Sequence, residues 1–307
     1  MSEDLGLWSV LIAVIGGAIR VSTPFLFVSL GETITERSGR INLGLEGTLV
    51  FGAMSAYGTA VLTNSPWAGV AVAALAGAAF GLLHGFVCRL PRVNDVAVGI
   101  ALMLFGSGLA FFLGKPFIQP SAPPLPAIPI GFWSSLPQVQ AALQVNVLFL
   151  AGAALSVFLW WAFRNTKAGL IVRVVGDSAD AARAMGYDVD RVRLYATATG
   201  GALAGIGGAY LSLYYPGSWN EGVSSGQGLM AVALVIFARW NPLACFGAAL
   251  LFGGAGALGP ALQSVGVSQG YYLFYAAPYV LTLALLIATA SPDRALAGAP
   301  GELSLSK

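Results

Sequence analysis

The sequence predicts an all-α fold, a polytopic transmembrane helical bundle of about nine spans within a range of about 8–10, and three observations support it. Of the 307 residues, 57% are hydrophobic and only 9% are charged, with a mean hydropathy of +0.79. A soluble chain carries about 25% charged residues. Apolar windows of about 20 residues recur, and each can cross a hydrocarbon layer of about 30 Å. The 40 glycines suit helices that approach closely in lipid.

The apolar windows define the expected spans within one transmembrane domain over residues 1–307. Only helices satisfy their backbone polar groups internally, so each window is expected to be helical. Arg20 interrupts the first window, and the seventh is short. The windows fall near residues 8–30, 42–63, 67–88, 94–114, 143–163, 194–215, 226–239, 242–262 and 269–290.

Positive charges orient these spans. If the loop RLPRVND (89–95) faces the cytoplasm, residues 31–41 and 164–193 also lie inside, whereas 115–142 and 216–225 lie outside. All of the 15 Lys and Arg residues except Arg20 and Lys115 then face the cytoplasm. The opposite orientation would invert this bias, so the N-terminus is expected outside.

The external segment 115–142 (KPFIQPSAPPLPAIPIGFWSSLPQVQAA) is rich in proline and nearly uncharged. Proline excludes a regular helix over most of it. Two interpretations stay open: a docking or gating surface, or a spacer that covers the outer ends of the helices.

Several classes of function lack support. A net charge of +2 is too small to indicate nucleic-acid binding. No G-x-x-x-x-G-K-[ST] motif is present, so ATP chemistry must reside in another polypeptide. His84, the single histidine, is expected to pack in its glycine-rich span, and no acidic cluster or CxxC supports a metal site or cofactor. Cys88 and Cys245 are expected to be free thiols, and no catalytic constellation indicates an enzyme.

Residues 164–193 form the most charged stretch and are predicted to contain a short helix. Asp177 and Ser178 offer an N-cap for a helix over 179–185, and Gly186 would end it. So short a helix is unstable alone. It therefore packs on a partner or on its own protein, and the alternatives are a docking surface for a cytoplasmic protein or a solvated connector. The candidate docking residues are Asp177, Ala181, Ala182, Met185 and Gly186.

Three blocks resemble the permease subunits of bacterial ABC importers for nucleosides and simple sugars, within the branched-chain amino acid, ribose and nucleoside permease superfamily. Their order and the INLGLEG pattern carry the resemblance, which spans about residues 36–290. The third block departs from the family at Ser178-Ala179, where the family often has Asn-Pro. The blocks are ERSGRINLGLEGTLVFGAMSAYG (36–58), RLPRVNDVAVGIALMLFGSGLAFFLG (89–114) and GDSADAARAMGYDVDRVRLYATATGGALAGIGGAYL (176–211).

The resemblance implies a permease domain in a bacterial cytoplasmic (inner) membrane and a set of partners. These are a cytoplasmic ABC ATPase docked near residues 177–186, a second homologous permease subunit and an external substrate-binding protein. The two permease subunits are expected to be different chains, with a homodimer as the alternative. The implied substrate is a nucleoside or a similar small polar solute, with a simple sugar or riboflavin as alternatives. An ion-coupled secondary transporter is the alternative from another class, and it predicts paired intramembrane acids.

Polar groups at membrane depth are costly and are functional candidates by default. Asn42 and Glu46 are four residues apart and are predicted to share one helical face. With Asn94, Ser107 and Gln227 they are the candidate lining of a substrate path. Structural alternatives stay open: Glu46 pairing with Arg20 or a cytoplasmic arginine, Asn94 capping the fourth helix, and Gln227 bonding a neighbouring helix.

Overall fold

The structure is a computed structural model that describes residues 3–133, 139–140, 143–264, 274, 276–289 and 298–305. The predicted window 269–290 and the external segment 115–142 therefore lie partly outside the described residues. All statements below concern the described part of the chain.

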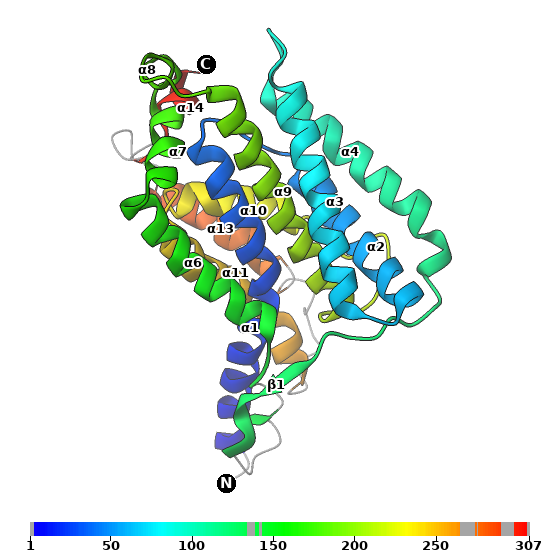
Figure 1. Ribbon diagram of the computed structural model, residues 1–307. Coiled ribbons are helices and arrows are strands. Elements are labelled where there is room, and N and C mark those ends of the chain that lie inside the picture. Colours follow the sequence, from blue (N-terminus) through cyan, green and yellow to red (C-terminus); the bar gives the residue numbers. More distant parts are fainter. Residues whose placement is uncertain are drawn as a thin grey trace.

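Helices dominate the described residues, and they follow the apolar windows closely (Figure 1). Six of them are long and apolar enough to cross a membrane: α1, α2, α3, α4 with its short 3-10 extension, α6 and α11. The shorter α10 is also apolar, and the count of about nine spans stays a prediction. The helices are α1 (Glu3–Arg37), α2 (Leu45–Thr63), α3 (Pro66–Val87), α4 (Asp95–Gly114), α6 (Val147–Asn165), α7 (Lys167–Asp177), α8 (Ala179–Ala184), α9 (Val189–Leu213), α10 (Gln227–Phe237), α11 (Pro242–Ser264), α13 (Ala277–Thr289) and α14 (Gly301–Leu305).

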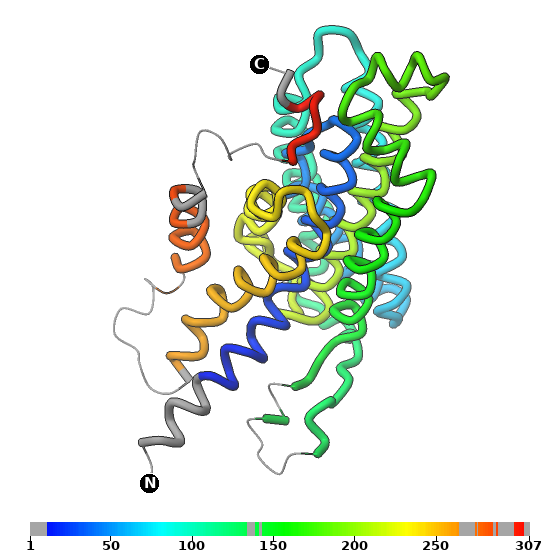
Figure 2. Tube along the Cα trace, turned by 90° about the vertical axis from the view of Figure 1, so that its left-hand side faces the viewer, coloured from blue at the N-terminus to red at the C-terminus, as the bar shows by residue number. Residues whose placement is uncertain are grey.

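Glycines let the central helix α9 pack tightly against α1, α2 and α3. Gly201 of α9 faces Gly77 of α3, and a methyl group added to either would overlap the carbonyl oxygen of the other. Gly200 approaches Gly31 of α1 in the same way. The expectation that glycines allow close approach of helices is thereby confirmed for these contacts. On the other side of α1 lies α11, and the two helices run alongside each other (Figure 2).

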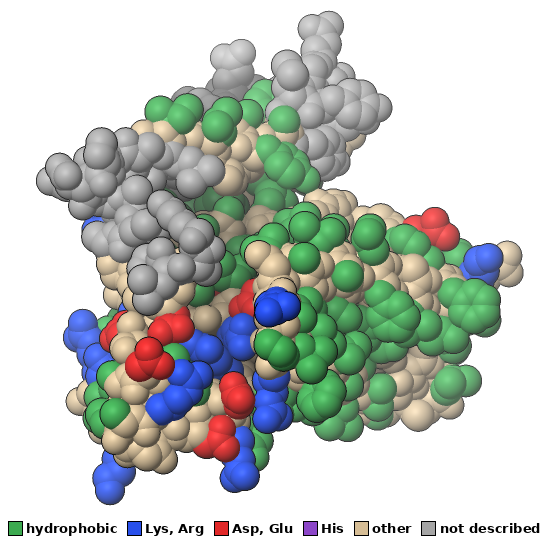
Figure 3. Space-filling model, turned by 90° about the horizontal axis from the view of Figure 1, so that it is seen from above, with side chains coloured by type: hydrophobic (Ala, Val, Ile, Leu, Met, Phe, Trp, Pro, Cys, Tyr) green, Lys and Arg blue, Asp and Glu red, His purple; other side chains and the backbone are tan. Residues whose placement is uncertain are grey.

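The two ends of the bundle differ in composition. Figure 1 shows α8, α14 and the C-terminal end at one end and the N-terminus at the other. From the α8 end, charged side chains gather on one part of the face and hydrophobic ones cover the flank beside it (Figure 3). This agrees with the predicted cytoplasmic side. Toward the opposite end, Ala127–Pro129 (β1) pairs antiparallel with Gln144–Asn146 (β2), and no α-helix occurs in the described part of the proline-rich segment before residue 139.

Helix α1 continues to Arg37 and therefore extends seven residues beyond the predicted first window, 8–30. The apolar stretch of α1 that is long enough to span a membrane is Leu11–Arg37. Arg20 and Pro24 are accommodated without ending the helix. Polar residues near its end, such as Glu32 and Glu36, are buried by neighbouring helices, and a hydropathy window does not detect such burial.

Candidate functional site

The chain between α9 and α10 is irregular and places the first residue of α10 beside α2. Ser225 and Gly226 both have left-handed backbone conformations, with φ of 46° and 79°. They turn the chain so that α10 begins at Gln227. Helix starts expose backbone N–H groups that need acceptors and carry partial positive charge. Glu46 of α2 supplies the acceptor.

The Glu46 carboxylate accepts three hydrogen bonds from this turn. Its Oε1 accepts from the Ser224 hydroxyl at 2.6 Å and from the Gly226 N–H at 3.1 Å, and its Oε2 accepts from the Gly228 N–H at 2.6 Å. None of these donors is an arginine. The carboxylate thus joins α2 to the start of α10, which is a structural role other than the ion pair that the sequence left open.

Asn42 lies outside the helix that carries Glu46, so the predicted shared helical face is wrong. Helix α2 begins only at Leu45. Asn42 is buried in the preceding turn, where its N–H donates to Glu32 Oε1 at 2.8 Å and its Oδ1 accepts from the Gly44 N–H at 2.9 Å. Glycine and asparagine favour turns of this kind over helix continuation.

Gln227 lines a cavity of about 450 Å³ between α1, the 215–225 segment, α10, α11 and the start of α13. Its side-chain Oε1 is buried and has no hydrogen-bond partner among the described residues. Buried polar atoms are nearly always paired, so an unpaired acceptor sets Gln227 apart from the other residues that line the cavity. The cavity is lined by Val21, Phe25, Tyr215, Pro216, Asn220, Gly222, Val223, Ser225, Gln227, Met230, Gly256, Pro260, Pro278 and Tyr279.

The structure brings together only two of the five predicted path residues, Glu46 and Gln227. Asn94 is exposed and caps α4, where its Oδ1 accepts from the N–H groups of Val96 at 2.9 Å and Ala97 at 3.1 Å. The alternative that Asn94 caps the fourth helix is therefore confirmed. Ser107 is half-buried within α4 and is absent from the lining of this cavity.

The predicted short helix is confirmed as α8. The Ser178 hydroxyl caps it by accepting from the Ala181 N–H at 3.2 Å, and Gly186 ends it with a φ of +84°. Ala182 packs inward in a small core with Val175 and Val189. The other four candidate docking residues are exposed: Asp177, Ala181, Met185 and Gly186.

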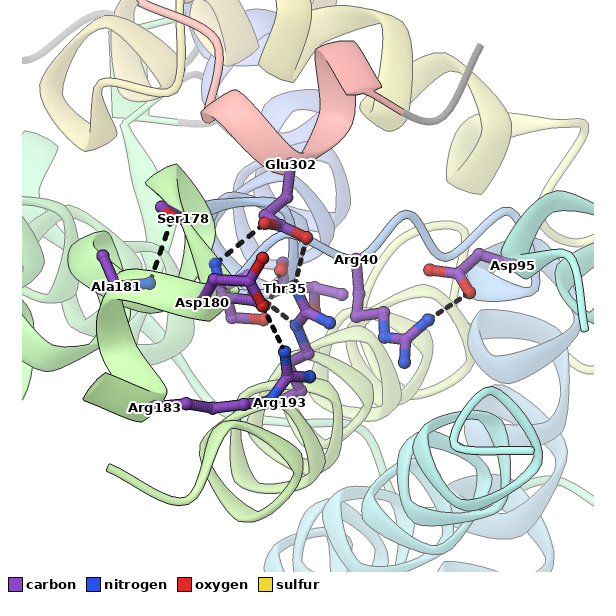
Figure 4. A network of polar contacts seen from close by, with 11 residues as sticks. Thr35, Arg40, Asp95, Ser178, Asp180, Ala181, Arg183, Arg193 and Glu302 are labelled. Atoms are coloured by element: carbon purple, nitrogen blue, oxygen red, sulfur yellow. Dashed lines mark hydrogen bonds and ion pairs between the residues drawn. The ribbon is translucent and has the colours of Figure 1, made fainter. Parts of the chain in front are cut away.

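The C-terminal helix α14 connects α8 to the transmembrane bundle (Figure 4). Glu302 Oε1 accepts from the Ala179 N–H at 2.8 Å, and its Oε2 accepts from Arg193 Nη2 at 3.0 Å. Arg193 also donates through Nε to the Ser38 carbonyl at 3.1 Å. Burial lowers the pKa of the Arg193 guanidinium, and the Glu302 carboxylate opposes this shift. These hydrogen bonds connect α8 through Glu302 and Arg193 to the turn after α1.

Sequence reasoning missed two buried carboxylates in α1, Glu32 and Glu36. Glu32 is fully buried and accepts from the Asn42 N–H, and Glu36 accepts from the Trp240 indole N–H. Both glutamates follow the first apolar window and are four residues apart, which places them on one face of a helix. This spacing is the sequence signal that could have predicted them. Among the described residues, no cluster of three His, Cys, Asp or Glu side chains is placed to hold a metal ion.

The profile of one protein family, the branched-chain amino acid transport system/permease component family, matches residues 14–290. The chain belongs to this family. It is therefore the permease component of an ABC transporter, a transport component and a multi-pass protein of the cytoplasmic (inner) membrane. As such, this permease works with an ATPase subunit and a substrate-binding protein. The ion-coupled alternative has no support.

Three curated relatives align over most of this permease. A proposed glucose ABC transporter permease of Haloferax volcanii is 34% identical, covering 83% of this chain and 79% of its own. A nucleoside ABC transporter permease of Lactococcus lactis is 30% identical, with coverage of 89% and 90%. A guanosine ABC transporter permease of Bacillus subtilis is 28% identical, with coverage of 90% and 92%.

Proposed function

We propose that this permease translocates nucleosides, or a chemically similar small polar solute, that an external binding protein delivers. The cavity at the start of α10 carries this proposal. It presents the aromatic side chains of Phe25, Tyr215 and Tyr279 together with the amides of Asn220 and Gln227. Aromatic faces stack on nucleobases at about 1–3 kcal/mol per base, and the amides offer hydrogen bonds to ring nitrogens and ribose hydroxyls.

The small number of polar groups suits passage of a solute. A translocation path must bind well enough to accept the solute and weakly enough to release it. Gln227, whose Oε1 has no hydrogen-bond partner among the described residues, is one of a few polar residues in a largely apolar and aromatic lining. Glu46 lies behind it and holds the turn that presents it. We therefore assign Gln227 to the path and Glu46 to its support.

The names of the relatives support two substrate classes. The nucleoside and guanosine permeases favour a nucleoside, whereas the relative at 34% identity favours a hexose as the second candidate. The aromatic lining favours the nucleoside, because a nucleobase has a flat face for each ring to cover.

The exposed surface of α8 is the proposed docking site for the ATPase, through Met185 and the residues beside it. Met185 is 55% exposed, and a flexible thioether side chain suits a groove on a partner. The second permease subunit is proposed to be a different chain, so that the pathway forms between two unlike subunits.

Reconstituted transport tests the substrate. The complete importer is placed in proteoliposomes with ATP inside and the binding protein outside, and uptake of labelled guanosine and glucose is compared. Guanosine uptake is expected, and Gln227→Leu should reduce it about tenfold, the loss of one hydrogen bond of about 1.4 kcal/mol. Gln263→Leu, at an exposed position of α11, is the matched control. Uptake of glucose but not guanosine would overturn the nucleoside assignment, and unchanged uptake by Gln227→Leu would remove Gln227 from the path.

Copurification tests the heterodimer. When this permease carries a tag and is coexpressed with a candidate second permease subunit, it is expected to copurify with that subunit in equal amounts. Recovery of an active importer containing two copies of this chain would refute the heterodimer.

A further inference from the structure

Four arginines converge on a second cavity at the cytoplasmic end of the bundle. The cavity has a volume of about 450 Å³ and lies between the ends of α1 and α6, helix α7 and the α10–α11 connection. Arg37, Arg164, Arg173 and Arg239 all line it. The other lining residues are Trp160, Phe163, Phe237, Ala238, Asn241, Pro242 and Ala244, so none of the described lining residues is acidic.

These arginines differ from the arginines elsewhere on the same side of the protein. Five arginines have a carboxylate within 4 Å: Arg40, Arg89, Arg183, Arg191 and Arg193. Within the part of the chain that the structure describes, none of the four cavity arginines has one. Arg37 donates to the Trp240 carbonyl at 2.9–3.1 Å, and Arg164 lies over the Trp160 ring at 4.7 Å. Arg173 Nε is buried without a hydrogen-bond partner in the described residues.

Such an arrangement is unfavourable without an anion. Like charges around one cavity repel, and a buried guanidinium N–H without an acceptor loses its hydration. A phosphate group would offset both costs, because the planar donor fork of arginine matches its oxygens and charge-assisted hydrogen bonds are the strongest type. The chemistry of the cavity therefore indicates a phosphate-bearing anion.

The surroundings indicate where that anion comes from. Apolar side chains that follow lining residues in the chain are exposed: Trp161 on α6 comes after Trp160 and is 48% exposed, and Leu243 on α11 comes after Pro242 and is 37% exposed. Acyl chains can cover such a surface while the headgroup reaches inward. Arg164 over Trp160 is also typical of the membrane–water interface, and basic pockets between transmembrane helices on the cytoplasmic side suit anionic headgroups.

We propose that this cavity binds the phosphate headgroup of an anionic phospholipid from the cytoplasmic leaflet. The lipid phosphate, with its single negative charge, would offset part of the charge of the four guanidiniums and join α1, α6, α7 and the α10–α11 connection. It would therefore stabilise the region that links α8, the proposed docking site for the ATPase, to the transmembrane bundle. The cavity is distinct from the proposed solute cavity, which is lined by other residues.

Thermal stability of the full-length permease in detergent, with added lipid, tests the proposal. Phosphatidylglycerol should raise the melting temperature of the wild type at a lower concentration than phosphatidylcholine does. Arg173→Gln should raise the half-saturating concentration of phosphatidylglycerol about tenfold, a typical cost of one lost charge-assisted bond. Arg191→Gln, which removes an exposed arginine paired to Asp188, is the control and should leave the concentration unchanged.

Further arms separate the possible sources of the anion. Arg239→Gln provides a second variant in case Arg173→Gln fails to fold, and it should show the same loss. Equal stabilisation by phosphatidylglycerol and phosphatidylcholine would overturn the proposal. Equal stabilisation by inorganic phosphate would assign the cavity to a soluble anion instead of a lipid. Release of phosphatidylglycerol on binding of the ATPase subunit would overturn the proposal, because the cavity would then belong to the interface with that subunit.

Discussion

Replacing Glu46 by glutamine tests whether the start of α10 depends on a carboxylate. The side chain is only 9% exposed, and both of its oxygens are used: Oε1 accepts from Ser224 and Gly226, and Oε2 accepts from Gly228. A carboxamide has one acceptor oxygen and one NH₂ group. Glu46→Gln therefore keeps the size of the side chain. Its NH₂ group, however, takes the place of one of the two acceptor oxygens and then faces a backbone N–H donor of the α10 start.

The expected cost follows from these three bonds. A hydrogen bond to a charged group contributes about 1.5–3 kcal/mol, and a neutral one about 0.5–1.5 kcal/mol. Weakening two bonds and leaving one donor without an acceptor gives a loss of about 3–5 kcal/mol in the free energy of unfolding. Since a domain of about 150–250 residues loses about 2–4 °C per kcal/mol, the melting temperature should fall by roughly 10 °C.

The assay is thermal unfolding of the purified permease in detergent, followed by uptake in the reconstituted importer. Glu221→Gln is the matched control, because Glu221 lies in the same connection and is exposed, and its melting temperature should not change. Ser224→Ala removes one donor and should cost about 1–2 kcal/mol, and its combination with Glu46→Gln should be less than additive. A Glu46→Gln permease that melts within about 2 °C of the wild type would refute the reasoning.

Three further substitutions test other parts of the structure. Met185→Asp on α8 should weaken ATPase binding by at least about tenfold, or 1.4 kcal/mol, while membrane insertion stays normal. If copurification of the ATPase and transport were both unchanged, α8 would not be the docking site. Glu302→Gln should lower transport per ATP hydrolysed while the ATPase stays bound, because the Ala179–Arg193 connection weakens; an unchanged ratio would contradict this link. Gly201→Val should destabilise the permease by at least about 1–3 kcal/mol, measured by thermal unfolding; equal melting would show that the α3–α9 contact can widen.

The local features of the sequence predicted the helices well, and they predicted individual contacts less well. Helix α8 was predicted because Ser178 and Gly186 act on backbone groups within a few residues of themselves. The cap of Asn94 was among the alternatives for the same reason. The prediction failed for Asn42, because the end of α1 and the turn before α2 depend on packing against other helices.

The candidate site shows the same division. Gln227 was a candidate for the substrate path, because a polar group at membrane depth is a functional candidate by default; it lines a cavity, and its place in the path stays a prediction. What lies around it could not be predicted, because the cavity is formed by residues from position 21 to position 279. The role of Glu302 was also missed: a glutamate near the end of the chain carries no local signal of its partner Arg193, 109 residues away.

The sequence by itself determined that this protein is a polytopic helical membrane protein and showed its family resemblance, and its charge bias predicted an orientation. Hydropathy, charge bias and helix caps depend on residues that are neighbours in the chain or on the surrounding lipid and water. The amino-acid sequence is therefore enough to predict them. Only the tertiary structure decided what the polar residues do. Glu46 accepts a hydrogen bond from Ser224, which is 178 residues away in the chain, and four arginines from four separate segments line one cavity. Helix packing brings these side chains together. Their separation in the chain carries no information about their distance in space.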